Sequence, residues 1–319
     1  MSKSKLLIIG AKPDTAGIGG VSIHVERLIY WLKNSSHQFD FCDYKKESIW
    51  KVVRLISSHQ VIHIHPSNPV FRLFLVCVSK VFRKRVIFTI HGDLGRFGRF
   101  KNLLDKWAVK WCDIPIAINE GSYKKALEYN PNSRLISAYL PPFSDGYLPS
   151  EIIEKINELR LNNKVIVATN ASVCSYTIDG KEIYGIDFLI KYFKTQLDYY
   201  LFISDPSGQY TDKYKKDSLD NVVFIKGNHS FYALMKHSDM AIRATATDGD
   251  SLSVKEGLSL GIKVIATDSV SRPDGVVLFK YNDPDSLGIA LQTPAQLDKF
   301  DQHDSLEKLI FLYNKLQLC

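Results

Sequence analysis

Residues 240–268 read MAIRATATDGDSLSVKEGLSLGIKVIATD, and this stretch decides the fold class. Its apolar run at 240–244 predicts a buried strand, which leads into a turn at 248–250. The segment that follows, closed by Gly261, predicts a helix, and the β-rich run at 263–267 predicts a second strand. A helix between two such strands is typical of a βαβ unit, in which the strands are parallel neighbours in one sheet.

The same alternation of strands and helices extends over the whole chain. Further strands are expected at 5–10, 61–65, 85–92, 114–119, 164–172, 199–204 and 222–227, and helices at 21–32, 70–82, 185–196, 230–238 and 304–319. Residues 138–151 contain three prolines and little periodicity, which is typical of a linker. A chain of 319 residues is long enough for two domains.

We therefore expect an α/β protein of two doubly wound Rossmann-like domains that face each other across a cleft. The expected boundaries are a first domain at 1–143, a second at 144–300, and a terminal helix at 301–319 that packs back on the first domain. Ligands of doubly wound sheets bind beyond the carboxyl ends of the strands, so the cleft is the expected site.

Charge is distributed unevenly between the two halves. Residues 1–149 carry 22 lysines and arginines against 11 acidic residues, whereas residues 150–319 carry 19 against 23. The basic residues alternate with Phe, Leu and Trp in segments 71–85 and 96–111. Such segments fit either the solvated faces of half-buried helices or peripheral contact with an anionic membrane. No nucleic-acid-binding motif accompanies the charge, so we expect no nucleic-acid partner.

The sequence also excludes several classes of protein. Its first apolar run stops at Gly10, too short for a signal peptide, and no other run is long enough to span a membrane. The five cysteines are far apart and odd in number, which predicts reduced thiols rather than disulfides or a zinc site. We expect a cytoplasmic protein, with any membrane contact confined to the inner face of the cell membrane.

A glycine-rich loop, GAKPDTAGIGGVSIH at 10–24, follows the first strand and leads into a helix. Backbone N–H groups at Gly19 and Gly20 could receive phosphate oxygens there. The spacing is neither G-x-G-x-x-G nor that of an ATP-binding loop, and a flexible turn explains the glycines equally well.

Histidines mark the ends of two expected strands. His91 precedes a glycine where the strand at 85–92 reaches the carboxyl edge of its sheet, a position that favours ligand contact. His63 and His65 occupy a similar position on the strand at 61–65. They have no carboxylate partner nearby in the sequence, so we expect no metal site from these three histidines.

The turn at 248–256, DGDSLSVKE, permits three interpretations. Asp248 and Asp250 could form a D-x-D metal site, and Ser253 with Glu256 matches the S-x-x-E capping box. The third interpretation is a ligand clamp, because helical side chains tilt towards the N-terminus and Glu256 would point at the loop that carries Asp248. Carboxylates accept hydrogen bonds from sugar hydroxyls and N–H groups donate to phosphate, and a sugar nucleotide offers both partners.

Seven residues separate Asp248 from Glu256, and this acid–loop–helix arrangement resembles the E-x7-E segment of GT4-type retaining glycosyltransferases, which have the two-domain GT-B fold. The variant DGDSLSVKEGL with VIATDSVSRPDGVVLF is similar to a branch found in bacterial surface polysaccharide synthesis. Other segments that resemble the family are GIGGVSIHVERL, VIFTIHG, EIYGIDFLIKYF and VVFIKGNHSFYALMKHSDMAIRAT.

The resemblance implies a donor site on specific positions. It places Asp248 on the donor-sugar hydroxyls, Glu256 on the nucleotide ribose and His91 near the sugar. The residues that it places on the sugar or the diphosphate are Gly19, Gly20, Gly249, Asp250, Ser251 and Leu252. The chain departs from the family in having Asp at 248 instead of Glu. It also lacks the usual basic pair for the diphosphate, for which Lys181 or Arg243 is the expected substitute.

The implied activity is metal-independent, retaining, hexosyltransferase-like transfer from a nucleotide-diphosphate sugar to a hydroxyl of a glycan or lipid-linked glycan. The implied pathway is synthesis of capsule, O-antigen of lipopolysaccharide, or exopolysaccharide, and no cofactor is expected. A GT-B fold disfavours the D-x-D metal site, since helix N–H groups and basic residues replace the metal there. Two alternatives stay open, a sugar-nucleotide epimerase and a catalytically silent sugar-nucleotide-binding scaffold for a partner transferase.

Overall fold

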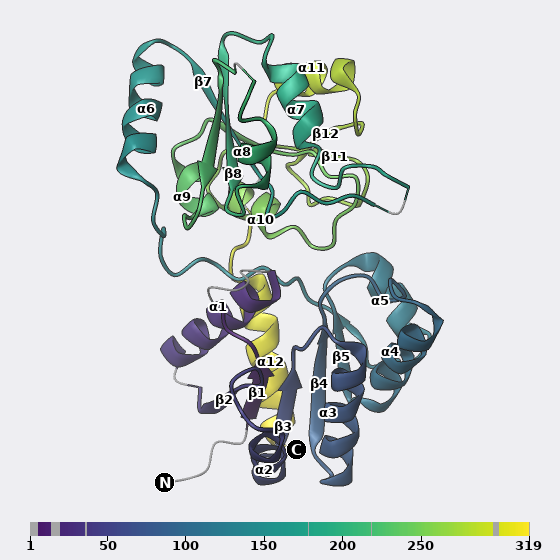
Figure 1. Ribbon diagram of the computed structural model, residues 1–319. Helices are drawn as coiled ribbons and strands as arrows, with labels where there is room; N and C mark the ends of the chain where they lie inside the picture. The colour runs from purple at the N-terminus through teal and green to yellow at the C-terminus, as the bar shows by residue number, and fades with distance from the viewer. Residues whose placement is uncertain are drawn as a thin grey trace. The chain divides into compact units, whose positions relative to one another are not determined.

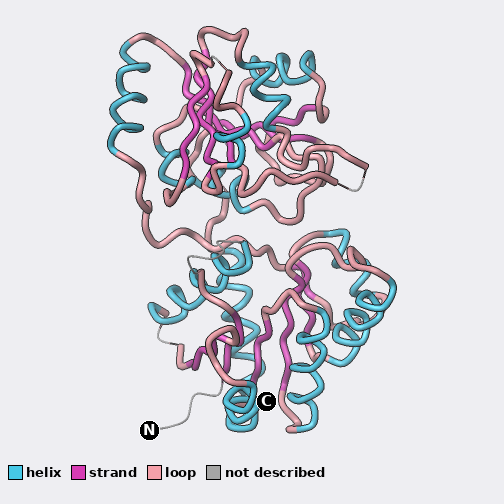
Figure 2. Tube along the Cα trace, viewed as in Figure 1, coloured by secondary structure: helices cyan, strands magenta, loops and turns pink. Residues whose placement is uncertain are grey.

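The chain divides into two compact units, each a parallel sheet flanked by helices (Figures 1 and 2). The first unit comprises the residues up to Phe143 together with those from Gln302 onward, and the second comprises Ser144–Asp301. The computed structural model describes residues 6–13, 20–35, 37–177, 179–217, 219–295 and 300–318.

The first unit contains a six-stranded parallel sheet in the order β2-β1-β3-β4-β5-β6. Its strands are β1 (Leu6–Gly10), β2 (Phe39–Asp43), β3 (Val61–Ile64), β4 (Arg85–Ile90), β5 (Ile114–Ala117) and β6 (Arg134–Leu135). Its helices are α1 (Gly20–Asn34), α2 (Ile49–Ser58), α3 (Pro69–Val81), α4 (Arg99–Trp111), α5 (Glu120–Leu127) and α12 (Asp304–Leu318).

Both faces of this sheet are covered, because successive side chains of a strand point to opposite faces. In β1, Leu7 and Ile9 pack with α2, α3, α4 and α5, whereas Leu6 and Ile8 pack with α1 and α12. The C-terminal helix α12, yellow in Figure 1, therefore completes the core of the first unit beside α1. Inside that core, the Tyr313 hydroxyl lies 2.7 Å from His63 Nδ1 on β3.

The second unit contains a six-stranded parallel sheet in the order β12-β11-β10-β7-β8-β9. Its strands are β7 (Val165–Asn170), β8 (Tyr199–Asp205), β9 (Val222–Lys226), β10 (Met240–Arg243), β11 (Lys263–Thr267) and β12 (Val277–Phe279). Its helices are α6 (Ser150–Leu161), α7 (Ile186–Phe193), α8 (Gln209–Lys213), α9 (Phe231–Lys236), α10 (Leu252–Ser259) and α11 (Pro284–Gln292).

Side-chain alternation again gives this sheet two covered faces. Val167 of β7 packs with α7, α8 and α11, whereas Ile166 and Ala168 pack with α6 and α9. Helix α10 packs on β11 through Val254 and Leu258.

The strand order locates the point in each sheet where the chain reverses its direction of winding. In the first unit this switch lies between β1 and β3, and in the second between β7 and β10. Helices diverge to opposite faces at such a point, which leaves a crevice at the carboxyl ends of the two strands where ligands of doubly wound sheets bind. The two crevices therefore lie near Gly10 and Ile64 in the first unit and near Asn170 and Arg243 in the second.

The two basic segments at 71–85 and 96–111 lie largely in α3 and α4. The expected linker at 138–151 carries the chain from the first unit to the second and ends in α6, a helix that the sequence did not indicate. Among the described residues, all four cysteines are free thiols. None of the described helices is both long enough and apolar enough to cross a lipid bilayer.

Candidate functional site

Arg243 lies at the switch point of the second unit, as the last residue of β10. Its guanidinium donates from Nη1 to Oδ1 of Asn170, the last residue of β7, over 3.2 Å. The same guanidinium lies over the Tyr184 ring, with its carbon 5.2 Å from the ring centroid. Contacts on two sides therefore fix the orientation of this cation at the carboxyl edge of the sheet.

Asp248 stands in the loop after β10 and accepts hydrogen bonds from two arginines. Arg243 Nε and Arg272 Nη1 each donate to its Oδ2 over 3.0 Å. The backbone N–H of Gly249 donates to Oδ1, also over 3.0 Å. Arg272 is the more enclosed cation, with a side chain 3% exposed against 15% for Arg243. We call Arg243, Asp248 and Arg272 the switch-point cluster.

The switch-point cluster has one more positive than negative charge. Burial raises the pKa of the Asp248 carboxyl, but the adjacent Arg243 and Arg272 guanidiniums outweigh burial and hold that pKa well below its usual range. Burial lowers the pKa of Arg272, and Asp248 opposes this effect. With the carboxylate ionised and both arginines charged, the cluster carries a net charge of +1 at the edge where a ligand would bind.

Arg272 was not predicted as a site residue. It donates from Nε to the backbone oxygen of Thr267, at the end of β11, over 3.1 Å. Its Nη2 donates to Thr245 Oγ1 over 3.1 Å. These bonds tie the loop that carries Asp248 to the segment after β11. The only sequence signal was its place in SVSRPDG, within the segment that resembles the polysaccharide branch.

Helix α10 begins directly after the Asp248 loop. Ser251 is its N-cap residue and makes no side-chain cap bond, and its Oγ lies 3.1 Å from Ser253 Oγ. The prediction of a Ser253–Glu256 capping box was wrong, because the helix starts at Leu252 and Ser253 lies inside it. Glu256 lies about one turn into the helix and is buried, 7% exposed.

The acids at 248 and 250 have different partners, which bears on the D-x-D interpretation. Asp250 forms an ion pair with Lys255 of α10, and Asp248 belongs to the switch-point cluster. Each carboxylate is thus balanced by protein cations. The carboxylate that the resemblance assigns to sugar hydroxyls is bonded here to two guanidiniums, and its sugar contact stays a prediction.

The remaining predicted residues lie elsewhere. Lys181 is exposed and pairs with Asp179 at 3.1 Å, and no contact among the described residues joins it to the switch-point cluster. In the first unit, Gly20 is the exposed first residue of α1, and Gly19 lies outside the described residues. His91 follows β4 and is buried, with its Nε2 3.0 Å from His65 Nδ1. Arg243 and the residues from Asp248 to Glu256 are thus the predicted positions gathered at one switch point.

Comparison with known proteins gives a likeness in structure alone. No protein-family model matches the chain, and no curated protein matches it. Among solved structures, HepE of Anabaena in complex with UDP superposes with a TM-score of 0.71 at 12% identity, over 98% of this chain and 100% of that one. A glycosyltransferase from Rickettsia africae gives 0.67 at 15% identity, over 99% of both chains.

A UDP-GlcNAc 2-epimerase from Methanocaldococcus jannaschii is also similar, with a TM-score of 0.61 at 11% identity over 97% of this chain and 99% of that one. These likenesses cover nearly the full length of every chain compared. The chain has the GT-B fold. The GT-B prediction is therefore confirmed at the level of the fold, and identities this low carry nothing further about activity.

Proposed function

We propose that this GT-B protein is a retaining glycosyltransferase that uses a nucleotide-diphosphate sugar as donor. The observation that carries the proposal is the switch-point cluster, with its net positive charge, directly before helix α10 and its buried Glu256. The cationic cluster and the N-terminus of the helix match the diphosphate of a sugar nucleotide, and the buried acid matches its ribose. HepE, similar in fold, has been solved with UDP and with UDP-glucose, which supports this ligand class.

In this proposal Arg243 and Arg272 stabilise the charge that develops on the departing diphosphate, together with N–H groups at the start of α10. Asp248 holds both guanidiniums in position. Glu256 accepts hydrogen bonds from the ribose hydroxyls. Fixed cations of this kind supply the charge that a divalent metal supplies in D-x-D sites, so we propose metal-independent transfer.

The proposed acceptor is a hydroxyl on a glycan or lipid-linked glycan of a bacterial surface polysaccharide, and we propose that α3 and α4 contact the membrane at which such acceptors are held. Exposed apolar side chains occur on both helices, among them Val70 and Phe74 on α3 and Phe100, Trp107 and Trp111 on α4. Lysines and arginines alternate with them along both segments, although Arg72 is buried and pairs with Asp105. Aromatic and basic residues together suit the headgroup region of an anionic bilayer.

A sugar-nucleotide epimerase is the second candidate, because an epimerase shares the fold. The test begins with thermal denaturation of the full chain in the presence of nucleoside diphosphates and their sugars, with and without chelator. The best ligand is then incubated with and without glycan acceptors, and the products are identified by mass spectrometry. Transfer predicts an acceptor-dependent product of retained anomeric configuration, whereas epimerisation predicts an altered donor without acceptor.

The matched variants are Glu256→Gln and Asp212→Asn. Glu256→Gln removes the buried carboxyl group with little change of volume, and we expect at least tenfold lower turnover. Asp212 is an exposed acid of the same unit, paired with Lys226, so Asp212→Asn should keep the wild-type rate. The proposal fails if no sugar nucleotide stabilises the fold, or if Glu256→Gln is as active as the control. Stabilisation without turnover would favour a silent binding scaffold instead.

A further inference from the structure

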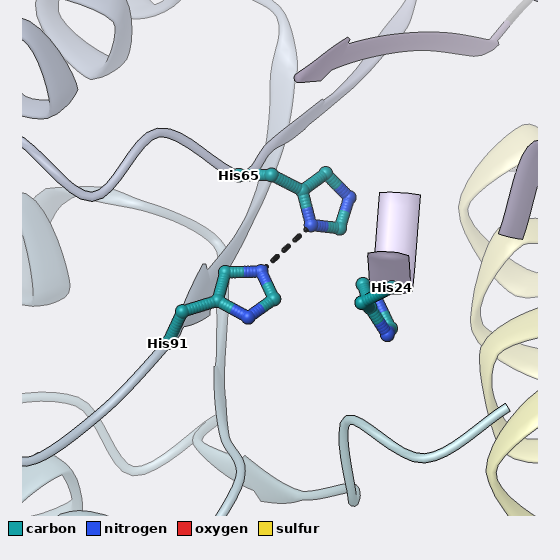
Figure 3. A group of neighbouring side chains, drawn as sticks. All are labelled: His24, His65 and His91. Carbon is teal, nitrogen blue, oxygen red and sulfur yellow. Dashed lines mark hydrogen bonds between the residues drawn. The ribbon is translucent and has the colours of Figure 1, made fainter. Parts of the chain in front are cut away.

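Three histidines from three different elements meet inside the first unit. His24 lies on α1, His65 directly follows β3 and His91 directly follows β4. They are 2%, 0% and 7% exposed, respectively. Figure 3 shows the three rings gathered around one small space, with the His65–His91 hydrogen bond dashed. This histidine triad lies at the carboxyl edge of the sheet, next to the switch between β1 and β3.

The spacing of the triad is close to that of a metal site. One ring nitrogen of each histidine lies within 4.8 Å of one ring nitrogen of each of the others. A zinc–nitrogen bond of about 2.0–2.1 Å with tetrahedral angles places ligand nitrogens about 3.3 Å apart. Rotation of the imidazoles, with the His65–His91 hydrogen bond given up, would bring three nitrogens onto one ion.

The hydrogen bond of His24 sets the tautomer that ligation requires. Its Nδ1 lies 2.7 Å from the backbone oxygen of Ala138, and a carbonyl oxygen can only accept a hydrogen bond. In the neutral ring the proton therefore sits on Nδ1, and Nε2 carries the lone pair. A bond from the second ring nitrogen to a backbone carbonyl is the usual support of a metal-binding histidine.

His65 contributes a second, independent observation. Its Nε2 is fully buried and has no hydrogen-bond partner among the described residues, although its Nδ1 is bonded to His91 Nε2. A buried polar atom without a partner costs free energy, and a rotation of the His65 ring that turned Nε2 onto an ion would remove that cost.

We infer that His24, His65 and His91 form a binding site for a divalent transition-metal ion of the zinc class. The triad supplies only imidazole nitrogens, which favours Zn²⁺, Co²⁺, Ni²⁺ or Cu²⁺ over Mg²⁺ or Mn²⁺. Three protein ligands leave a fourth position for water or another small ligand. The site belongs to the first unit and does not depend on the donor site proposed for the second.

His63 is not part of this site, although the sequence groups it with His65 and His91. Its Nδ1 lies 2.7 Å from the Tyr313 hydroxyl and its Nε2 2.8 Å from Thr89 Oγ1, so both nitrogens are engaged. The expectation that these three histidines form no metal site rested on the lack of a carboxylate partner nearby in the sequence. The fold replaces His63 with His24, which is distant in sequence and reaches the site from α1.

The test uses the purified full chain after chelation and removal of the chelator. Zn²⁺ is titrated against a chromophoric competitor, and bound metal is counted by mass spectrometry. We expect one ion per chain, with affinity at least tenfold weaker in His24→Gln, His65→Gln and His91→Gln. His37→Gln is the matched control, because His37 is outside the triad and pairs at the surface with Asn314. Equal affinity in the control and in His65→Gln would refute the site.

A second measurement needs no variant to fold. Co²⁺ added to the metal-free wild-type chain should give the strong visible absorption of a four-coordinate site, and Zn²⁺ should displace it. Zn²⁺ should also raise the thermal midpoint of the wild type in proportion to the logarithm of its concentration, because the folded state alone holds the triad together. The proposal is overturned if the wild type shows neither the absorption nor a rise in midpoint.

Discussion

Asp248 is the residue on which the arrangement of the proposed donor site depends. Two guanidiniums of the second unit converge on one carboxylate that is 10% exposed. A buried charge is stabilised by the opposite charges beside it. Removal of the carboxylate would therefore leave the two guanidiniums buried without a counter-ion.

Asp248→Ala should therefore destabilise the second unit strongly. With the carboxylate gone, Arg243 and Arg272 face each other without a counter-ion, and we expect a loss of about 3 kcal/mol or more in the free energy of unfolding. Urea denaturation followed by circular dichroism measures this loss. Asp212→Ala is the control, because its exposed ion pair should contribute less than about 1 kcal/mol. Similar losses in the two variants would contradict the role of Asp248.

The buried histidines should make the stability of the first unit depend on pH. Burial lowers the pKa of His63, His65 and His91 well below 6.5, and neighbouring His24 lowers each further. Unfolded histidines have a pKa of about 6.5, so below that pH the unfolded chain binds protons that the folded chain does not. The stabilisation is therefore complete above the unfolded pKa and declines as the pH falls through it.

The expected loss between pH 7.5 and pH 5.5 is about 1.4 kcal/mol per histidine, or about 4 kcal/mol for the three. Urea denaturation at several pH values, in chelator to remove any bound metal, measures it. His65→Gln should flatten the profile by about a third, whereas His37→Gln should leave it unchanged. A profile with no slope over this range would show that the rings are protonated in the folded state.

At the residue scale the sequence predicted part of the site. The acids at 248 and 256, and Arg243, could be read from one local segment, because turn and helix spacing place them near each other. Arg272 and His24 could not, since their partners are distant in sequence and only the strand order brings them together. Local motifs predict local geometry, whereas Arg272 and His24 reach their sites through contacts between segments that are distant in sequence.

Helices α3 and α4 show how a buried ion pair can join two elements. Arg72 of α3 donates to Asp105 of α4, and both side chains are 2% exposed. The Arg72 guanidinium also lies over the Phe88 ring, 4.5 Å from its centroid, and donates to the backbone oxygens of Pro66 and Ser67. The pair therefore fixes α3 against both α4 and the sheet.

Asp105→Ala should cost about 3–5 kcal/mol of unfolding free energy, because it leaves the Arg72 charge buried without a partner. Arg72→Met combined with Asp105→Leu should cost far less than the two single variants summed, since an apolar pair of similar volume needs no compensation. Urea denaturation of the two single variants and the double variant gives the coupling energy. Additive losses would mean that the pair does not act as a unit.

At the element scale, the strongly apolar strands were predictable and the weakly patterned elements were not. Runs such as LLIIG and RVIFTI are buried on both faces and stand out in the sequence. The edge strand β2, FDFCD, is only partly buried, and α6 buries just Ile156 and Leu159. Elements that bury so few side chains have only a weak hydrophobic periodicity in the sequence. Their formation depends on packing against the rest of the sheet and its core.

At the scale of the whole molecule, the excess of positive charge in the first half coincides with the apolar side chains exposed on α3 and α4. The positive charge by itself is also compatible with helix faces that are simply exposed to solvent, which is one of the two interpretations of the sequence. Exposed rings add a reason for an interface, because Trp107 and Trp111 stack at 5.9 Å between centroids and both are more than 40% exposed.

The full chain should bind vesicles that contain anionic lipid more tightly than neutral ones, and high salt should weaken this binding. Trp107→Ser with Trp111→Ser should reduce partition several-fold, because the rings no longer enter the headgroup region. Vesicle co-sedimentation measures the effect. Leu161→Ser, at an exposed leucine of the second unit, is the control and should leave partition unchanged. Equal binding to neutral and anionic vesicles would refute an electrostatic contribution.

The return of α12 to the first unit has a consequence for how the protein is made. The second unit is one continuous segment of chain, whereas the first depends on residues of α12 that leave the ribosome after the whole second unit. Until α12 emerges, Leu6, Ile8 and the other apolar side chains on that face of the first sheet lack part of their cover. During synthesis the second unit can thus be completed before the first, and the nascent first unit exposes an apolar face that chaperones would recognise.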